Sequence, residues 1–169
     1  MNYPKVSDVR DLSGLTIPGR FKSKSGGTLE VAFAMPEDLA REFFSADPKE
    51  LAISTKMRLG FREYVVRSLP KGSIGGTEFH RIRQEIVFGL EGKTRWICED
   101  LFGNRREFML EAHTGLWQPP FLLHTYEVLE DNSGIAVIAN TLFDPNDQKT
   151  FDTYSRELFL DLQREAAGA

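Results

Sequence analysis

From about residue 57 to residue 159, the apolar positions of the chain come in short runs separated by Gly, Pro, Asn and Asp. Runs of this length, repeated roughly every ten residues, predict β-strands joined by tight turns. Such a series of short strands indicates an all-β sandwich or barrel. We expect the strands at residues 28–33, 61–66, 85–90, 94–98, 106–110, 115–118, 123–128 and 134–139.

Two segments have the periodicity of a helix. Residues 36–48 begin with proline and two acidic residues, which favour the first turn of a helix, and Leu39 and Phe43 follow on one side. Residues 153–167 carry apolar side chains at intervals of four, which predicts a C-terminal helix. We therefore expect a helical insertion and a closing helix around the strands.

The first nineteen residues contain the turn formers Ser13-Gly14 and Pro18-Gly19, so we expect residues 1–19 to form an arm or a short strand. No repeat, low-complexity tract or linker divides the rest of the chain. The sequence is thus interpreted as one domain over residues 1–169.

Composition narrows the possible partners. The 169 residues are 41% hydrophobic, enough for a core. Lys and Arg number 21 against 25 Asp and Glu, and no basic stripe stands out, which argues against nucleic-acid binding. No apolar run has membrane-spanning length and the single cysteine, Cys98, cannot form an intramolecular disulfide, so we expect a soluble cytoplasmic protein that does not bind membranes.

The candidate chemistry gathers around one predicted strand. Glu78 and His80 are two residues apart, so on a strand they project from the same face. Glu85 can join them from the next strand, and His124 from a hairpin across the barrel. These four side chains could ligate a metal or transfer a proton.

Several motifs, in this order, resemble those of the cupin-fold sugar-nucleotide 3,4-ketoisomerases, which act on dTDP-4-keto-6-deoxyglucose. The resemblance covers roughly residues 27–159. It departs from the family at two positions, because Glu78 stands in place of the first of two cavity histidines and Gly75 in place of an arginine. The matching landmarks are Phe61-Arg62-Glu63-Tyr64, Gly76-Thr77-Glu78-Phe79-His80, and residues 84–92, 115–124 and 142–147.

The resemblance implies a cupin-type antiparallel β-barrel, or jelly roll, and a sugar-nucleotide isomerase that uses neither a metal nor another cofactor. It also implies a homodimer in which residues 27–33 pair with the sheet of the partner. In the reaction, His80 would carry the proton, Glu78 would orient and polarise that ring, and Tyr64 would hydrogen-bond the developing oxyanion. The substrate-binding residues would be Arg62, Trp117, His124 and Glu85.

Three alternatives stay open at this stage. A mononuclear site for iron(II), manganese or zinc could use Glu78, His80, Glu85 and His124. A non-catalytic module could keep the cavity for a carbohydrate or nucleotide, with Trp96 or Trp117 stacking on the ligand and Arg62, Arg81 or Arg83 meeting a pyrophosphate. Alternatively, His80 could be a buried structural residue satisfied by Glu78 or by a backbone carbonyl.

Overall fold

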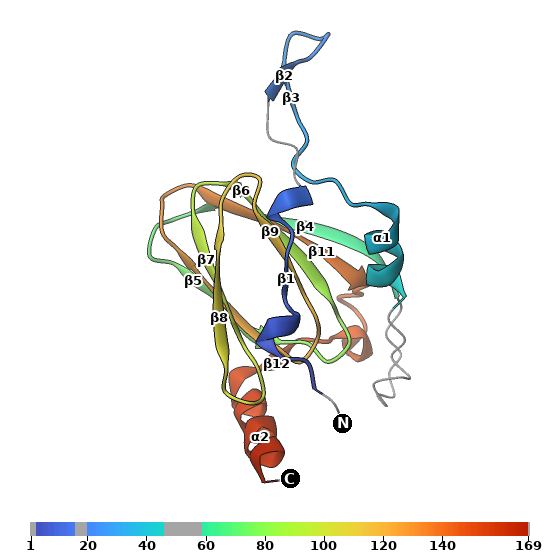
Figure 1. Ribbon diagram of the computed structural model, residues 1–169, viewed down its shortest axis with the longest axis vertical. Coiled ribbons are helices and arrows are strands. Elements are labelled where there is room, and N and C mark those ends of the chain that lie inside the picture. Colours follow the sequence, from blue (N-terminus) through green and yellow to red (C-terminus); the bar gives the residue numbers. More distant parts are fainter. Residues whose placement is uncertain (1–2, 16–19, 46–58, 169) are drawn as a thin grey trace.

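The computed structural model describes residues 3–15, 20–45 and 59–168. Two five-stranded antiparallel sheets form the body of the molecule (Figure 1). The first has the order β1-β9-β6-β11-β4, with β1 Arg10–Asp11, β9 Gly115–Gln118, β6 Glu85–Glu91, β11 Ser133–Thr141 and β4 Leu59–Leu69. The second has the order β12-β5-β10-β7-β8, with β12 Tyr154–Ser155, β5 Ile74–Phe79, β10 Leu123–Val128, β7 Thr94–Glu99 and β8 Arg105–Leu110.

Most neighbours within each sheet are far apart in the sequence, as the crossovers of a jelly roll require. The predicted all-β antiparallel barrel is confirmed. The strands predicted at residues 115–118 and 123–128 have the predicted bounds, and the other predicted barrel strands are one to three residues longer at one or both ends. Short 3-10 turns at Val6–Asp8, Ser13–Leu15 and Gln148–Thr150 complete the described structure.

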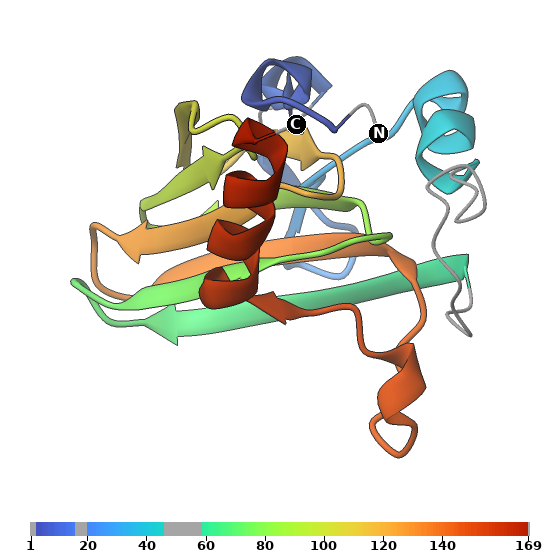
Figure 2. The same cartoon turned by 90° about the horizontal axis from the view of Figure 1, so that it is seen from below.

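Both predicted helices are present, with shifted limits. Helix α1 spans Glu37–Phe44, inside the predicted range 36–48, whose last three residues lie outside the described part. Helix α2, Arg156–Ala167, begins three residues later than predicted and ends where predicted, because Tyr154 and Ser155 extend the second sheet by pairing with Phe79 and Glu78. The helices lie well apart in both ribbon views (Figures 1 and 2).

The second and third strands of the chain form a hairpin that stands away from the barrel (Figure 1). Among the described residues, strand β2, Arg20–Lys22, pairs only with β3, Thr28–Glu30. The strand expected at residues 28–33 is therefore half that length. Phe21 and Leu29 on this hairpin are each about half exposed. The turn expected at Pro18-Gly19 lies outside the described residues.

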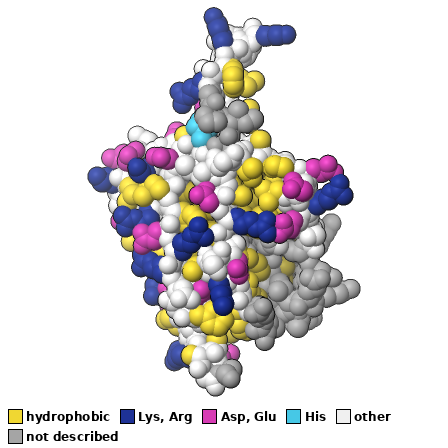
Figure 3. All heavy atoms as spheres, viewed as in Figure 1, with side chains coloured by type: hydrophobic (Ala, Val, Ile, Leu, Met, Phe, Trp, Pro, Cys, Tyr) yellow, Lys and Arg dark blue, Asp and Glu magenta, His cyan; other side chains and the backbone are white. Residues whose placement is uncertain are grey.

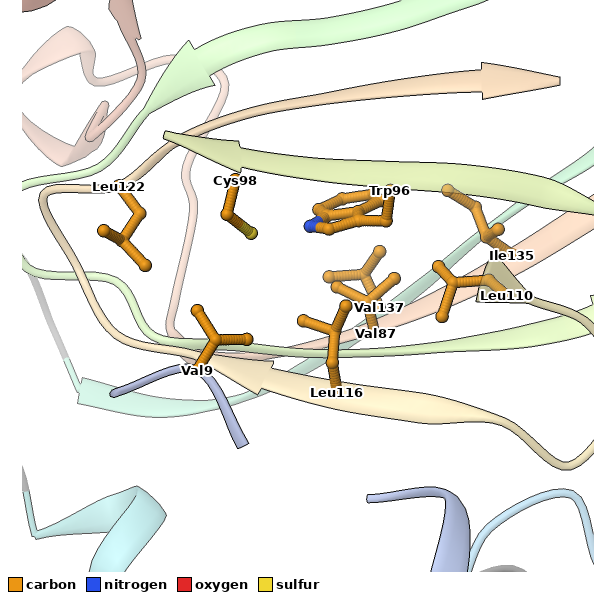
Figure 4. Packing of buried hydrophobic residues seen from close by; sticks show 9 residues of the cluster. All are labelled: Val9, Val87, Trp96, Cys98, Leu110, Leu116, Leu122, Ile135 and Val137. Carbon is orange, nitrogen blue, oxygen red and sulfur yellow. The ribbon is translucent and has the colours of Figure 1, made fainter. Parts of the chain in front are cut away.

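An apolar cluster fills the space between the two sheets (Figure 4). Alternate residues of the first sheet point inward, among them Val87, Leu116 and Val137. They meet Trp96 and Cys98 from the second sheet. The outer face of the first sheet packs against α1 through a separate cluster, which contains Phe43, Ile86, Trp117, Ala136 and Ile138.

Charges of both signs are interspersed over the face shown in Figure 3. That distribution provides no basic track for a phosphate backbone on this face. Among the residues that the structure describes, neither helix is long and apolar enough to cross a membrane.

Candidate functional site

A bulge in β5 sets up the site. Glu78 pairs with His124 and Gly76 pairs with Thr125, so the register skips Thr77. Gly76 and Thr77 both have positive φ angles, 71° and 68°, and for a β-branched threonine this conformation is strained. A bulge of this kind re-aims the side chains beside it. Here Glu78 is directed at His124 on the neighbouring strand.

The structure brings Glu78, His80 and His124 together. One nitrogen or oxygen atom of each lies within 4.8 Å of the others, so the convergence predicted from sequence is confirmed. Their exposure differs: the side chain of Glu78 is 35% exposed, whereas His80 and His124 are buried. Glu78 is therefore the member of this cluster that reaches open space.

Glu85 lies at the centre of the buried network, with 1% of its surface exposed. Its Oε1 accepts hydrogen bonds from the Tyr64 hydroxyl at 2.9 Å and from Arg83 Nη1 at 3.1 Å, and it lies 3.3 Å from His80 Nε2. Its Oε2 accepts from Gln118 Nε2 at 3.1 Å. Glu85 therefore joins the two histidines from the next strand, as the sequence predicted.

The charge of Glu85 follows from these neighbours. Burial alone would raise the pKa of this carboxyl, but the surrounding His80, His124 and Arg83 hold it well below its ordinary range. Glu85 is therefore an ionised carboxylate. In turn, burial and the charge of Glu85 raise the pKa of Tyr64, which keeps the phenol protonated.

His80 is held from both sides. Its Nδ1 lies 2.5 Å from the backbone oxygen of Asp152, which can only accept, so Nδ1 carries a hydrogen and Nε2 faces Glu85. The carboxylate beside His80 is thus Glu85, whereas the carboxylate of Glu78 lies nearer to His124, 4.0 Å from its Nε2. The Asp152 carboxylate fixes the loop after His80, because it accepts hydrogen bonds from the backbone N–H groups of Arg81, Ile82 and Arg83.

A cavity of about 390 Å³ opens beside this network. Neither histidine lines it, so open space reaches the network through Glu78, Tyr64 and Arg83. Residues alternate in and out along β4, which places Arg62 and Tyr64 together on its inner side. The lining residues are Arg62, Tyr64, Glu78, Arg83, Phe143, Phe151 and Thr153.

Arg62 gives the cavity an uncompensated positive charge. Its guanidinium lies 5.4 Å from the ring centroids of both Tyr64 and Phe143, and no described carboxylate is within 4.0 Å of it. Burial and the nearby Arg83 lower the pKa of Arg62, and a guanidinium stays protonated in proteins. An anionic group could therefore form paired hydrogen bonds with this guanidinium.

Trp117 does not line the cavity, contrary to the expectation from sequence. It lies between the inward-facing Leu116 and Gln118, so its own side chain points outward. There it packs edge-on against Phe43 at 5.5 Å and under Arg10 at 4.4 Å. The aromatic surface in the cavity belongs instead to Phe143 and Phe151, whose ring centroids are 5.0 Å apart.

Sequence reasoning missed Gln118 and Asp152. A signal for Gln118 was available, because it alternates with Leu116 on a predicted strand and so must point into the barrel. Asp152 gave no signal, because it lies some seventy residues from the backbone groups that it binds.

A stack of three rings runs beside the network. His124 lies over Trp96 at 5.0 Å, and Trp96 lies over Tyr126 at 6.0 Å, with nearly parallel planes. Tyr126 fills the space beside Gly75, where an added Cβ would come within 2.2 Å of its ring. A longer side chain at position 75 would therefore displace this ring.

A second hollow, of about 670 Å³, lies between α2 and the turn after β7. Its lining includes Leu101, Phe102 and Leu160 but no histidine or carboxylate. Of these two hollows, the smaller one therefore holds the groups capable of acid-base chemistry.

No family model matches the sequence, and no curated protein is a significant match to it. Solved structures are similar in fold. The TDP-fucose 3,4-ketoisomerase from Campylobacter jejuni has a TM-score of 0.60 and 14% identity, over 95% of this chain and 98% of that chain. A sugar 3,4-ketoisomerase from Thermoanaerobacterium thermosaccharolyticum in complex with TDP has a TM-score of 0.60 and 13% identity, over 95% and 98%.

A dTDP-4-dehydrorhamnose 3,5-epimerase from Bacillus anthracis, with TDP and pyrophosphate bound, has a TM-score of 0.55 and 14% identity. The match covers 86% of this chain and 81% of the epimerase. At these identities the likeness establishes a shared jelly-roll fold, and activity has to be argued from the site.

Proposed function

We propose that this protein is a sugar-nucleotide isomerase that converts a 4-keto-6-deoxyhexose nucleotide by proton transfer through an enediolate. The observation that carries the proposal is the buried His80–Glu85 pair, which Glu78 connects to a cavity containing the unpaired Arg62. The solved structures of the same fold support it, because two are named as 3,4-ketoisomerases.

The reaction moves two hydrogens and needs no oxidant. A base removes the hydrogen from C3 while the C4 carbonyl oxygen takes up the electrons and a proton. The C3 hydroxyl then loses its proton as a carbonyl forms there, and a proton is delivered to C4. His80 is suited to carry the proton, because an imidazole can both accept and return a proton.

Glu78 and Tyr64 would serve this chemistry from the cavity wall. Glu78 is the exposed member of the cluster, so it meets the substrate and orients the exchange with His80. The Tyr64 hydroxyl donates to Glu85 and lines the cavity, so it can turn its hydrogen toward a developing oxyanion.

Arg62, Phe143 and Phe151 favour a nucleotide diphosphate as the anchor of the substrate. The guanidinium would bind phosphate oxygens, and the two rings offer faces for a base or sugar. We expect calorimetric titration with dTDP to show binding, and Arg62→Gln to weaken it about 10- to 100-fold, since a charge-assisted hydrogen bond contributes about 1.5–3 kcal/mol.

Arg81→Gln is the matched control, because Arg81 lies outside the cavity against Phe121 and Tyr154 and should leave dTDP affinity unchanged. Absence of both heat and a thermal shift with dTDP would contradict the proposal. Binding of the 4-keto sugar nucleotide without conversion would favour the non-catalytic carbohydrate-binding alternative.

We further propose that the protein is a homodimer in which residues 27–33 pair with the sheet of the partner. The β2–β3 hairpin exposes Phe21 and Leu29 and has no other strand beside it in the described part of its own chain. Strand β4 is a long sheet edge with Phe61 and Val65 exposed, which is a surface that proteins usually cover.

Light scattering at micromolar concentration should give twice the chain mass of 19.2 kDa. Replacing Phe21 and Leu29 together with serine should shift the protein toward the monomer, because the exposed apolar contact is lost. Phe102→Ser provides a control, since Phe102 is equally exposed but lies in the turn after β7. A wild-type monomer would overturn this assignment.

A further inference from the structure

A chain of directional hydrogen bonds leads from the core to His124. Trp96 Nε1 lies 3.0 Å from Gln118 Oε1. On the other side of the same amide, Gln118 Nε2 lies 3.1 Å from Glu85 Oε2 and 3.0 Å from His124 Nδ1. Gln118 and His124 are both at most 3% exposed.

The orientation of the Gln118 amide follows from partners that can act in only one way. The indole N–H of Trp96 can only donate, so it needs the amide oxygen. The ionised Glu85 carboxylate can only accept, so it needs the amide nitrogen. Turning the amide over would place two donors together on one side and two acceptors together on the other.

The orientation of the amide determines where the hydrogen of His124 lies. Gln118 Nε2 has two hydrogens, one for Glu85 and one for His124 Nδ1, so Nδ1 must present its lone pair. The remaining ring nitrogen, Nε2, then bears the hydrogen of the neutral ring. It lies 3.7 Å from Glu85 Oε2 and 4.0 Å from Glu78 Oε1, on the cluster side.

We propose that Trp96 and Gln118 hold His124 as a neutral hydrogen-bond donor whose Nε2–H points into the site, so that His124 serves neither as a base nor as a metal ligand. The stack of Trp96 on His124 keeps the ring in the required plane. This inference rests on the proposed isomerase function for its chemical meaning, because it leaves the acid-base step to His80 and makes His124 a fixed donor on the side of Glu78 and Glu85.

The charges around His124 agree with this assignment. Glu85 and the backbone of Leu122 favour a protonated ring, while His80 and Arg83 oppose it. Burial dominates and lowers the pKa of His124 to about 3. Gln118 is therefore a positioning residue that orients His124 as a donor, and His80 keeps the acid-base role.

The same geometry argues against a metal held by Glu78, His80 and His124. A metal would need the lone pair of Nε2 from each histidine. His80 can offer it, because its Nδ1–H is bound to Asp152, but His124 presents a hydrogen there. If His124 bound a metal through Nε2, its Nδ1 would carry the hydrogen and face the N–H of Gln118. The hydrogen bond from Trp96 holds the amide in this orientation, so two donors would meet.

Nitrogen-15 NMR of the imidazoles tests this without substrate. The chain has three histidines, so replacing each one assigns the spectrum. We expect His124 to show an unprotonated Nδ1 and a protonated Nε2 at pH 7, and equimolar Zn²⁺ to leave both signals in place. Gln118→Met should move the Nδ1 signal toward that of a nitrogen without a hydrogen bond.

Trp96→Phe is a second route, because it removes only the indole donor that orients the amide, and it should also shift His124 Nδ1. Tyr126→Phe, in the same stack, should shift nothing. A protonated Nδ1 in the wild type, a Zn²⁺-induced change at both histidines, or no response to either variant would overturn the inference. Because no sugar nucleotide is used, these outcomes are independent of the dTDP titration.

Discussion

Replacing His80 with asparagine is expected to lower turnover of the 4-keto sugar nucleotide by on the order of 10²–10⁴-fold, the usual cost of losing a positioned acid-base group. The amide cannot accept and return a proton, although its nitrogen can still donate toward the Asp152 carbonyl that anchors His80. The loop after His80 should persist, because the Asp152 carboxylate holds it through backbone groups. Steady-state kinetics with the folded variant measures the loss.

Glu78→Gln is the informative comparison. If Glu78 orients the exchange and His80 carries the proton, the glutamine variant should lose less activity than His80→Asn. The carboxylate in contact with His80 is Glu85, so Glu78→Gln should leave the environment of that ring largely intact. A dead Glu78→Gln enzyme beside an active His80→Asn enzyme would make the exposed carboxylate the base.

Glu85→Gln should be the most destabilising of the substitutions discussed. It removes the negative charge that compensates the buried Arg83 and faces both histidines. Breaking a buried pair by removing one partner typically costs about 3–5 kcal/mol. For a chain of this size, that corresponds to a fall in melting temperature of roughly 10 °C. Urea unfolding at pH 7 measures the change in free energy of unfolding.

Glu107→Gln is the control, because Glu107 pairs with Arg95 and Arg105 at the surface, where an ion pair contributes about 0–1 kcal/mol. Equal effects of the two substitutions would contradict a buried charge network at Glu85. A much larger effect at position 85 would support it.

The difference between wild type and Glu85→Gln should depend on pH in one direction. The folded pKa of Glu85 lies below the unfolded value, so its stabilising contribution is complete above about pH 4.3 and is lost as pH falls further. The advantage of the wild type should therefore shrink below about pH 4. An advantage that grew on acidification would show that Glu85 is protonated in the fold.

Most barrel strands were predictable because each buries one or both faces and ends at Gly, Asn, Asp or Pro. Strand parity predicted that Glu78 and His80 share a face. His124 was expected from across the barrel, but it meets Glu78 from β10, the strand beside β5 in the same sheet. The outward direction of the Trp117 side chain was not predictable. Both faces of the first sheet are apolar, and the sequence does not show that α1 packs on the outer one. Had parity been applied from the inward Leu116, Gln118 would have replaced Trp117 as the candidate.

Parity also could not identify the partner of His80. A bulge that skips one residue changes which side chains meet, and the sequence of β5 does not state that Thr77 adopts a positive φ angle. Asp152 was hidden for another reason, since its partners are backbone groups of a distant loop, and backbone hydrogen bonds leave little trace in side-chain patterns.

Tyr126 has a consequence for how this site could change over evolutionary time or by engineering. Its ring occupies the volume into which any side chain at position 75 would grow, so Gly75→Arg alone would force the ring off Trp96. Shortening Tyr126 first would open that volume and disturb only the outer layer of the stack. We therefore expect the two substitutions to be tolerated when Tyr126 is replaced first, and not in the opposite order.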